Sequence, residues 1–240
     1  MACACGALPL VSALLKAGAN PNLCDRTGAS CVAMAASAGH AHVLQKLLEH
    51  KTIVPTYDVA GLTPVHKAVG FGQPDCLRCL LQHGVDPNVL TGDVTLPADY
   101  GAAPSRYETA LHIAARLLTR AINSPDGAGS SERQQRQQRE LMRILLEFGA
   151  DALAQDVNGD TPLHYSARTG DVWGFCLLLQ SVDDPKAALL TCNASGEDVW
   201  SSIHDSTFPI RIAAKTAPGM LRLKQRIKLL ISPDSTFPIR

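Results

Sequence analysis

The sequence has no net charge, because its 22 basic and 22 acidic residues cancel. Such a chain creates no long-range field that would attract nucleic acid or an anionic membrane, so we predict no nucleic-acid partner. No run approaches the roughly 18 apolar residues of a membrane helix. The start, Met-Ala-Cys-Ala-Cys-Gly, has no basic region before an apolar stretch. These absences argue against a membrane span and a secretory signal and predict a cytoplasmic protein, with the nucleus as the alternative.

Recognisable catalytic motifs are missing as well. The sequence has no G-x-x-x-x-G-K-[ST] phosphate loop, no G-x-S-x-G nucleophile turn and no H-E-x-x-H zinc motif. We therefore predict no enzymatic activity, no catalytic residues and no cofactor. Eight cysteines are present, and Cys76 and Cys79 form a C-x-x-C, but no second pair completes a zinc site. Both positions suit apolar helix residues, so we interpret them as reduced thiols in a core and predict no metal.

A repeated unit of about 33 residues is what the sequence does contain, and residues 58–90 show it best. Thr63 suits a helix N-cap, and Pro64 suits the first helical position, where its missing N–H is harmless. A second apolar run at 76–81 has helical spacing, and Gly84 is suited to end that helix. Each unit is thus expected to be a turn and two antiparallel helices. A unit this small cannot bury its own apolar faces and needs neighbours.

Copies of this unit divide the chain into repeats. We place them at 1–24 (partial), 25–57, 58–90, 91–155 (with insertions) and 156–192, and assign 193–240 to a degenerate C-terminal repeat or cap with a basic amphipathic helix. The first unit lacks most of its first helix, which indicates either a divergent cap or a truncated gene product. In the second unit, residues 30–33 replace the usual helix start, which predicts a weaker one.

Two insertions lengthen the fourth unit. One adds 13 residues to its turn at 91–108, and the other adds 19 residues between its helices, at 120–138. Composition predicts a flexible loop at 124–131, then a helix capped by Ser131, so that the second helix gains two turns. Its arginines would share one face, which is either solvated or a docking site for an acidic partner. They are Arg133, Arg136, Arg139 and Arg143.

Three helix starts carry nearly the same motif: T-P-V-H-K-A at 63–68, T-A-L-H-I-A at 109–114 and T-P-L-H-Y-S at 161–166. In motif, period and cap together, residues 8–192 resemble ankyrin repeats. The resemblance implies an all-α solenoid of stacked helix-turn-helix units joined by β-turn or hairpin loops. It implies that the motif histidines form hydrogen bonds at the helix start and to a neighbouring turn. The structural motif residues are Thr63, Pro64, His66, Thr109, His112, Thr161, Pro162 and His164.

The resemblance also implies a monomeric, non-enzymatic scaffold or adaptor for a partner protein. Its binding surface would be the concave face of the turn tips and first helices, with the long turns. Aromatic and arginine side chains are preferred anchors, because they bury much area at small entropic loss; for the aromatics, packing onto the next repeat is the alternative. The predicted partner-binding residues are Leu62, Phe71, Tyr100, Tyr107, Arg133, Arg136, Val157, Asp160, Arg168, Thr169 and Trp200.

A substrate-recognition adaptor of a ubiquitin ligase is the alternative function, with a C-terminal helix at 219–231 docking a ligase subunit. Ankyrin proteins with a SOCS box carry L-x-x-x-C in that helix, whereas Leu221 here is followed four residues later by Gln225. The helix has one apolar side, and its basic residues lie mostly elsewhere. We interpret it as a cap with a solvated outer face, the alternatives being membrane-surface, calmodulin-type or nuclear-import binding.

Overall fold

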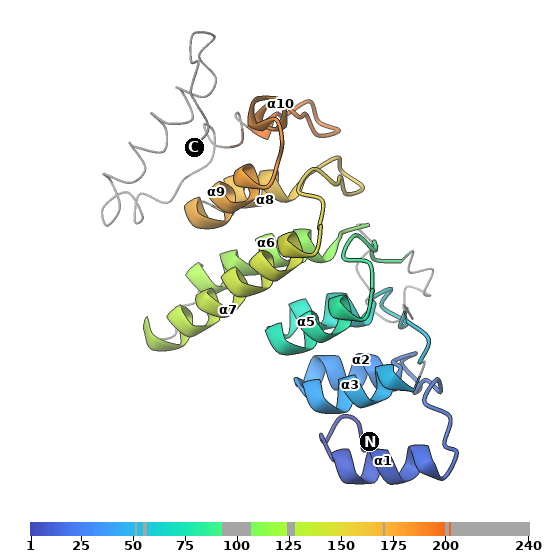
Figure 1. The fold of residues 1–240 in the computed structure, drawn as a ribbon. Coiled ribbons are helices and arrows are strands. Elements are labelled where there is room, and N and C mark those ends of the chain that lie inside the picture. Colours follow the sequence, from blue (N-terminus) through green and yellow to red (C-terminus); the bar gives the residue numbers. More distant parts are fainter. Residues whose placement is uncertain are drawn as a thin grey trace.

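The computed structural model describes residues 1–50, 52–54, 57–92, 107–123, 128–169, 171–199 and 202. Within these residues the chain forms ten helices and three isolated β-bridges. The helices are α1 (Leu8–Lys16), α2 (Cys31–Ala38), α3 (Ala41–Glu49), α4 (Pro64–Gly70), α5 (Pro74–Gln82), α6 (Ala110–Asn123), α7 (Ala128–Glu147), α8 (Pro162–Thr169), α9 (Val172–Gln180) and α10 (Pro185–Leu189). Figure 1 shows them stacked in chain order.

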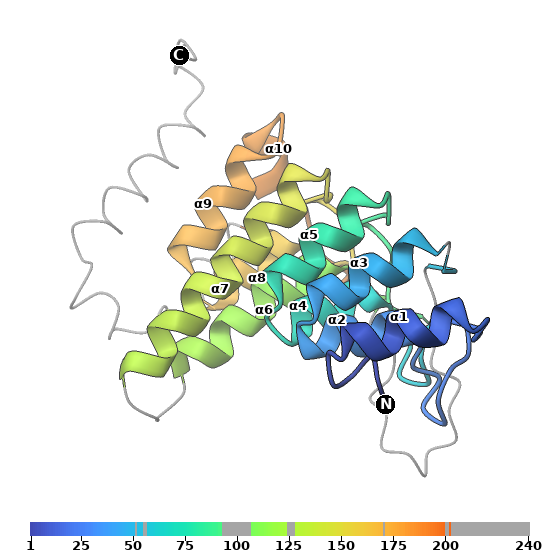
Figure 2. The same ribbon diagram turned by 60° about the horizontal axis from the view of Figure 1, so that its bottom comes forward.

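The helices form two layers. The first helix of each unit contacts the first helix of the next, in the order α2, α4, α6 and α8. The second helices, α1, α3, α5, α7 and α9, form the other layer in the same way, and each of the pairs α2–α3, α4–α5, α6–α7 and α8–α9 packs within its unit (Figures 1 and 2). The predicted all-α solenoid of stacked helix-turn-helix units is thereby confirmed.

One apolar core runs through the whole stack, from Cys3 to Val199. Burying a leucine side chain stabilises a fold by roughly 1.5–3 kcal/mol, but only where a second surface covers it. In this chain the neighbouring units supply that surface. The largest fully buried side chains come from all four helix pairs and include Leu44, Leu77, Leu80, Leu111, Leu145, Leu163 and Leu178. A single unit taken out of the stack would expose most of them.

The second unit starts its helix without the Thr-Pro-x-His motif. Ser30 takes the cap position, and its Oγ accepts the backbone N–H of Ala33 at 3.2 Å. A serine cap satisfies one of the orphan donors at a helix start as well as threonine does. The predicted weakness of this helix start is therefore offset by a local hydrogen bond.

The inserted residues extend a helical hairpin. α6 has 14 residues and α7 has 20, whereas α4 has 7 and α5 has 9. The loop predicted at 124–131 is wrong in its second half, because α7 begins at Ala128, and Ser131 lies inside the helix rather than at its cap. Once a run of good helix formers is nucleated, each further residue adds a bond at little extra entropic loss. The hairpin projects beyond its neighbours (Figure 2).

The predicted arginine face on α7 is only partly present. The guanidinium of Arg139 lies over the Trp173 ring, 5.2 Å from its centroid, and Arg139 is half-buried. Arg143 is bound to Glu140, with Nε 3.3 Å from Oε2. The side chains of Arg133 and Arg136 are exposed. The face therefore splits, because Arg139 turns toward α9.

Candidate functional site

The turns that precede the first helices share one hydrogen-bonding pattern. In four of these turns, Oδ1 of an aspartate or asparagine accepts the backbone N–H groups two and four residues later. For Asp58 these belong to Ala60 (2.9 Å) and Leu62 (2.8 Å), and for Asp156 to Asn158 (2.8 Å) and Asp160 (2.9 Å). Asp25 and Asn193 bond in the same way. Such side-chain bonds fix the turn backbone locally.

Successive turns are also joined to each other by backbone hydrogen bonds. Val59 N–H donates to Thr27 C=O at 2.9 Å, and Ala194 N–H donates to Asn158 C=O at 2.8 Å. Gly159, with φ of +72°, allows this close approach, because an added Cβ would lie 2.8 Å from the nitrogen of Ala194. Only glycine fits there without displacing backbone. The turns therefore form a row with fixed spacing.

Threonine and histidine close three of the helix starts. Thr63 N–H donates to Nδ1 of His66 at 3.2 Å, and Thr161 N–H donates to Nδ1 of His164 at 3.1 Å. Thr109 makes the same bond to His112 at 3.1 Å. Each threonine Oγ1 lies 2.8–2.9 Å from the same ring nitrogen. Pro64 follows Thr63 and Pro162 follows Thr161, each as the first helical residue, where no N–H is needed.

The other ring nitrogen reaches toward the next turn. Because Nδ1 accepts a hydrogen bond, the proton of the neutral ring lies on Nε2. Nε2 of His112 donates to Asp160 C=O at 3.0 Å, and Nε2 of His164 donates to Glu197 C=O at 3.3 Å. His66 Nε2 has no hydrogen bond of normal geometry among the described residues, although the backbone carbonyls of Val89 and Glu108 act to raise the pKa of its ring. His112 and His164 thus link their helix starts with the unit that follows.

Exposed apolar side chains lie along the row of turns. Val157, directly after Asp156, is 57% exposed, and Val59 occupies the equivalent place after Asp58. Large exposed apolar residues that gather on one part of a surface mark an interaction site. We call this row the turn edge: Leu23, Ile53, Tyr57, Val59, Leu90, Tyr107, Leu153, Val157 and Leu190.

Two arginines on the first helices are held in place by buried carboxylates. Arg116 Nη2 lies 3.2 Å from Glu108 Oε2, and Arg168 Nη2 donates to Asp160 Oδ1 at 2.9 Å. Burial alone would raise the pKa of Asp160, but hydrogen bonds from Arg168 and Asn193 lower it below its usual value. Arg168 also contacts Glu197 at 3.2 Å. The two guanidinium groups are therefore fixed in orientation and largely neutralised.

The structure separates the predicted partner-binding residues into groups. Tyr107 and Val157 lie exposed on the turn edge, and Leu62 is half-buried beside it. Asp160 is only 4% exposed, so its carboxylate orients Arg168 rather than facing a partner. Arg168 keeps an exposed side chain at the end of α8.

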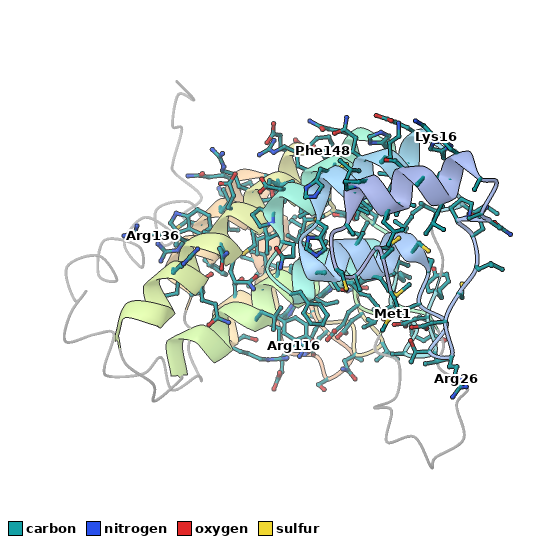
Figure 3. The ribbon with its side chains drawn as sticks, turned by 90° about the horizontal axis from the view of Figure 1, so that it is seen from below. Met1, Lys16, Arg26, Arg116, Arg136 and Phe148 are labelled. Atoms are coloured by element: carbon teal, nitrogen blue, oxygen red, sulfur yellow. The ribbon has the colours of Figure 1, made fainter. Side chains whose placement is uncertain are left out.

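The remaining predicted residues lie elsewhere. Phe71 is 65% exposed but follows α4, at the end of the helix pair away from the turn edge. Arg133 and Arg136 lie on α7, and Figure 3 shows Arg136 at the opposite end of the molecule from Arg26, which belongs to a turn. Thr169 ends α8, and its side chain is not described. Tyr100, Trp200 and the helix expected at 219–231 lie outside the described residues.

Sequence reasoning missed Val59, Tyr57 and Arg116. A signal was present for two of them. Val59 follows Asp58 as Val157 follows Asp156, and Arg116 lies eight residues after Glu108, the same spacing that separates Arg168 from Asp160. Comparing equivalent positions between units, rather than residue types within one unit, would have found these side chains.

Cys76 and Cys79, the pair with C-x-x-C spacing, lie in the environment of core residues. Cys76 is fully buried, and burial raises the pKa of its thiol to about 12. Burial also raises the pKa of Cys79. A thiol with a raised pKa carries little thiolate, the form that binds metal or reacts. Among the residues described, no group of three or more histidine, cysteine, aspartate or glutamate side chains is placed to hold a metal ion.

The described helices include none that is long and apolar enough to cross a membrane.

The two helix layers and the hydrogen-bonded row of turns define a class: a solenoid of helix-turn-helix repeats. Comparison with known families agrees with this class. Residues 1–91 match the family described as ankyrin repeats (3 copies), and residues 137–179 match ankyrin repeats (many copies). The chain belongs to the ankyrin-repeat proteins, which confirms the resemblance stated from the motifs.

Several curated proteins are similar to this chain. The NF-kappa-B p105 subunit of Gallus gallus is 32% identical over 67% of the chain and 14% of that protein, and inversin of Gallus gallus is 38% identical over 67% of the chain and 15% of that protein. The E3 ubiquitin-protein ligase KEG of Arabidopsis thaliana is 27% identical over 72% of the chain and 14% of that protein. The chain spans about a seventh of the length of these relatives. Ankyrin repeats generally mediate protein–protein interaction.

Proposed function

We propose that this chain is a non-enzymatic, monomeric scaffold or adaptor that binds a partner protein along its turn edge and the adjoining concave face of the first helices. The observation that carries the proposal is the row of exposed apolar side chains on turns whose backbone is fixed by hydrogen bonds. Zero net charge supports a protein rather than a nucleic acid as partner, and we propose the cytoplasm as its place of action.

Rigidity of the turns favours binding. A side chain on a fixed backbone loses less conformational freedom on association than one on a mobile loop. Val59 and Val157 each stand one residue after an aspartate whose carboxylate bonds the turn. Their exposed surface is removed from water when a partner covers it, at about 25 cal/mol per Å² of apolar area. The predominant contribution to affinity is therefore apolar burial.

Arg116 and Arg168, which are paired with carboxylates, would orient a bound partner rather than attract it by net charge. Arg168 is paired with Asp160 and contacts Glu197, so little net charge remains for a partner. Its N–H groups keep a fixed orientation, and backbone carbonyls or side-chain oxygens of a partner suit them. Arg116 has the same arrangement with Glu108 one unit earlier. We assign these two residues to orienting the partner across neighbouring units.

Charge introduced on the turn edge tests this proposal. The double variant Val59→Asp with Val157→Asp is compared with the double variant Leu10→Asp with Leu14→Asp. Leu10 and Leu14 are exposed apolar residues as well, but they lie on α1. We expect proteins retained on the immobilised wild-type chain to be retained by the α1 variant and lost by the turn-edge variant. Equal retention by all three, or equal loss in both variants, would contradict the proposed surface.

The similarity to KEG, whose name identifies it as an E3 ubiquitin-protein ligase, favours the ligase adaptor as a second candidate. In that function the turn edge would bind the substrate, and residues 219–231 would dock a ligase subunit. The same capture experiment tests it, because a ligase subunit should then be retained by the turn-edge variant and lost by Leu221→Asp. Absence of any such subunit among the retained proteins would contradict this candidate.

A further inference from the structure

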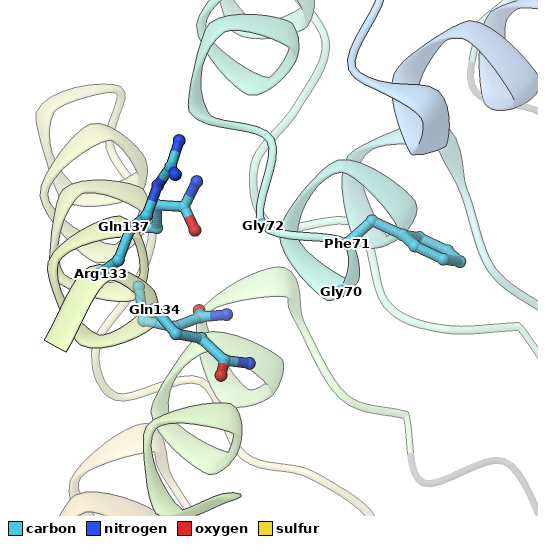
Figure 4. Close-up of a pocket in the computed structure, with 7 residues that line it drawn as sticks. Gly70, Phe71, Gly72, Arg133, Gln134 and Gln137 are labelled. Carbon is cyan, nitrogen blue, oxygen red and sulfur yellow. The ribbon is translucent and has the colours of Figure 1, made fainter. Parts of the chain in front are cut away.

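A pocket of about 270 Å³ lies between the α4–α5 connection and the inserted part of α7. Figure 4 shows α7 on one side and the connection on the other. The lining residues are Gly70, Phe71, Gly72, Arg133, Gln134, Gln137 and Gln138. The volume is below the roughly 300–1,000 Å³ of pockets that enclose small molecules. Its size therefore suits part of a larger partner better than a whole small ligand.

The α7 wall of this pocket exists because of the insertion. The nine residues of α5 correspond to the last nine residues of α7, so residues 128–138 are additional turns. Every α7 residue in the pocket comes from these additional turns. A unit of ordinary length would leave the α4–α5 connection facing solvent at this place. The pocket is thus a feature of this chain and not of the repeat.

The chemistry of the α7 wall is positive and rich in amides. Between Arg133 and Arg139 the helix has three arginines, four glutamines and no acidic residue. Arg133 is exposed and forms no ion pair with the carboxylates that the structure describes. Gln138 is only 3% exposed, and its Oε1 has no hydrogen-bond partner among the described residues. A buried acceptor without a donor favours a ligand that brings an N–H group.

The opposite wall, formed by the α4–α5 connection, is apolar, and its backbone N–H groups are not available to a ligand. The N–H groups of Phe71, Gly72 and Gln73 are already donated to carbonyls of α4. The ring of Phe71 is directed away from the α7 wall in Figure 4, and the residue is 65% exposed. A Cβ added at Gly70 would meet no atom within 4 Å. An anionic group is therefore attracted to Arg133, while an apolar group is attracted to Phe71.

The geometry points to a docking site for an acidic, partly apolar segment of a partner protein. A carboxylate of the segment pairs with Arg133, a backbone N–H of the segment donates to Gln138 Oε1, and a neighbouring apolar side chain covers Phe71. Charge complementarity selects this occupant, since arginine binds carboxylates well. A nucleic acid fits less well, because the pocket presents one arginine rather than a series of phosphate contacts. This site is separate from the turn edge.

The test uses fluorescence anisotropy with a labelled peptide of alternating glutamate and leucine residues spaced by serine, and the full chain. Arg133→Gln should weaken binding by about fivefold to tenfold, as expected for loss of a charge-assisted bond. Arg136→Gln is the matched control, because it removes the same charge from the same helix outside the pocket. It should change binding by less than about twofold. Equal weakening by both variants would overturn the proposal in favour of general charge attraction.

Two further measurements separate the alternatives. Gly70→Leu fills the pocket without touching its charges and favours helix, so it should abolish peptide binding while the melting temperature is kept; full binding by this variant would overturn the site. A peptide with lysine in place of glutamate should not bind. Tighter binding of a single-stranded oligonucleotide than of the acidic peptide would also overturn the proposal. The Val59→Asp, Val157→Asp variant should bind the peptide normally, so failure here is distinguishable from failure of the turn-edge proposal.

Discussion

His66, His112 and His164 are neutral side chains at equivalent places in three units. Burial lowers the pKa of all three, and for His66 to about 4. A second proton would have to bind Nδ1, which already accepts the threonine N–H. Protonation therefore removes a hydrogen bond at the helix start and places a charge in the core. The function of these residues depends on their remaining uncharged.

We predict that stability falls as the solution becomes mildly acidic. Unfolded histidine has a pKa of about 6.5, so between that value and about 4 the unfolded chain binds more protons than the folded chain at His66. The free energy of unfolding should decrease by about 2 kcal/mol for this residue alone between about pH 7 and 5. Urea unfolding at several pH values measures it.

A comparison variant makes the assignment specific. His66→Gln removes the titrating ring, and its pH dependence between these values should be shallower than that of the wild type, whatever its overall stability. His112 and His164 have pKa values shifted in the same direction, so a residual slope is expected. An identical slope in the variant would refute the role of His66.

At the scale of elements, the turns differ in how closely they approach their neighbours. Gly159 and Gly196 occupy the same place in successive turns, with φ of +72° and +78°. A Cβ at Gly159 would lie 2.8 Å from the nitrogen of Ala194, whereas a Cβ at Gly196 would meet nothing within 4 Å. The two glycines therefore share a backbone requirement, and only Gly159 has a packing requirement.

Gly159→Ala should destabilise the protein more than Gly196→Ala does. Both variants incur about 1–2 kcal/mol for a left-handed backbone with a Cβ. Gly159→Ala must in addition displace the turn at Asn193 and Ala194, which we expect to add about 1 kcal/mol or more. Thermal unfolding of the two variants measures the difference. Equal losses would show that the turns are not in close contact in solution.

At the scale of the whole molecule, the main helix contacts in the described part of the chain join neighbours in the stack. Each first helix contacts the first helices before and after it, and the second helices do the same. In such an arrangement the stability is approximately a sum over units and the interfaces between them. A defect in the middle therefore interrupts the stack, whereas a defect near one end affects that end.

Leu111→Ala and Leu44→Ala test this description, because both residues are fully buried leucines. Each truncation should cost about 2–5 kcal/mol. Hydrogen exchange should show lost protection on both sides of α6 for Leu111→Ala, but mainly in α1, α2 and α3 for Leu44→Ala. If both variants lose protection evenly along the chain, the stack unfolds as one unit and the nearest-neighbour description is wrong.

The fold was predictable from the sequence because helix starts depend on local chemistry. Thr161, Pro162 and His164 lie within four residues of each other, so their motif is legible without the structure. The pocket was not predictable, since Phe71 and Arg133 come from different units and line one pocket only because the helical hairpin is extended. Composition alone misjudged residues 128–131, where serine and glycine suggested a loop but the adjoining helix continued through them.

The backbone hydrogen bonds between turns also bear on how the solenoid would bend. Along that side, neighbouring units are tied by main-chain groups such as Val59 N–H and Thr27 C=O. On the other side, the second helices meet through apolar side chains and, between α5 and α7, through the ion pairs of Arg78 with Glu140 and Glu147; side-chain contacts adjust more easily than main-chain hydrogen bonds stretch. If the solenoid bends, we expect the row of turns to keep its length while the second helices spread or close. A partner bound along the turn edge, as we propose, would then experience little strain.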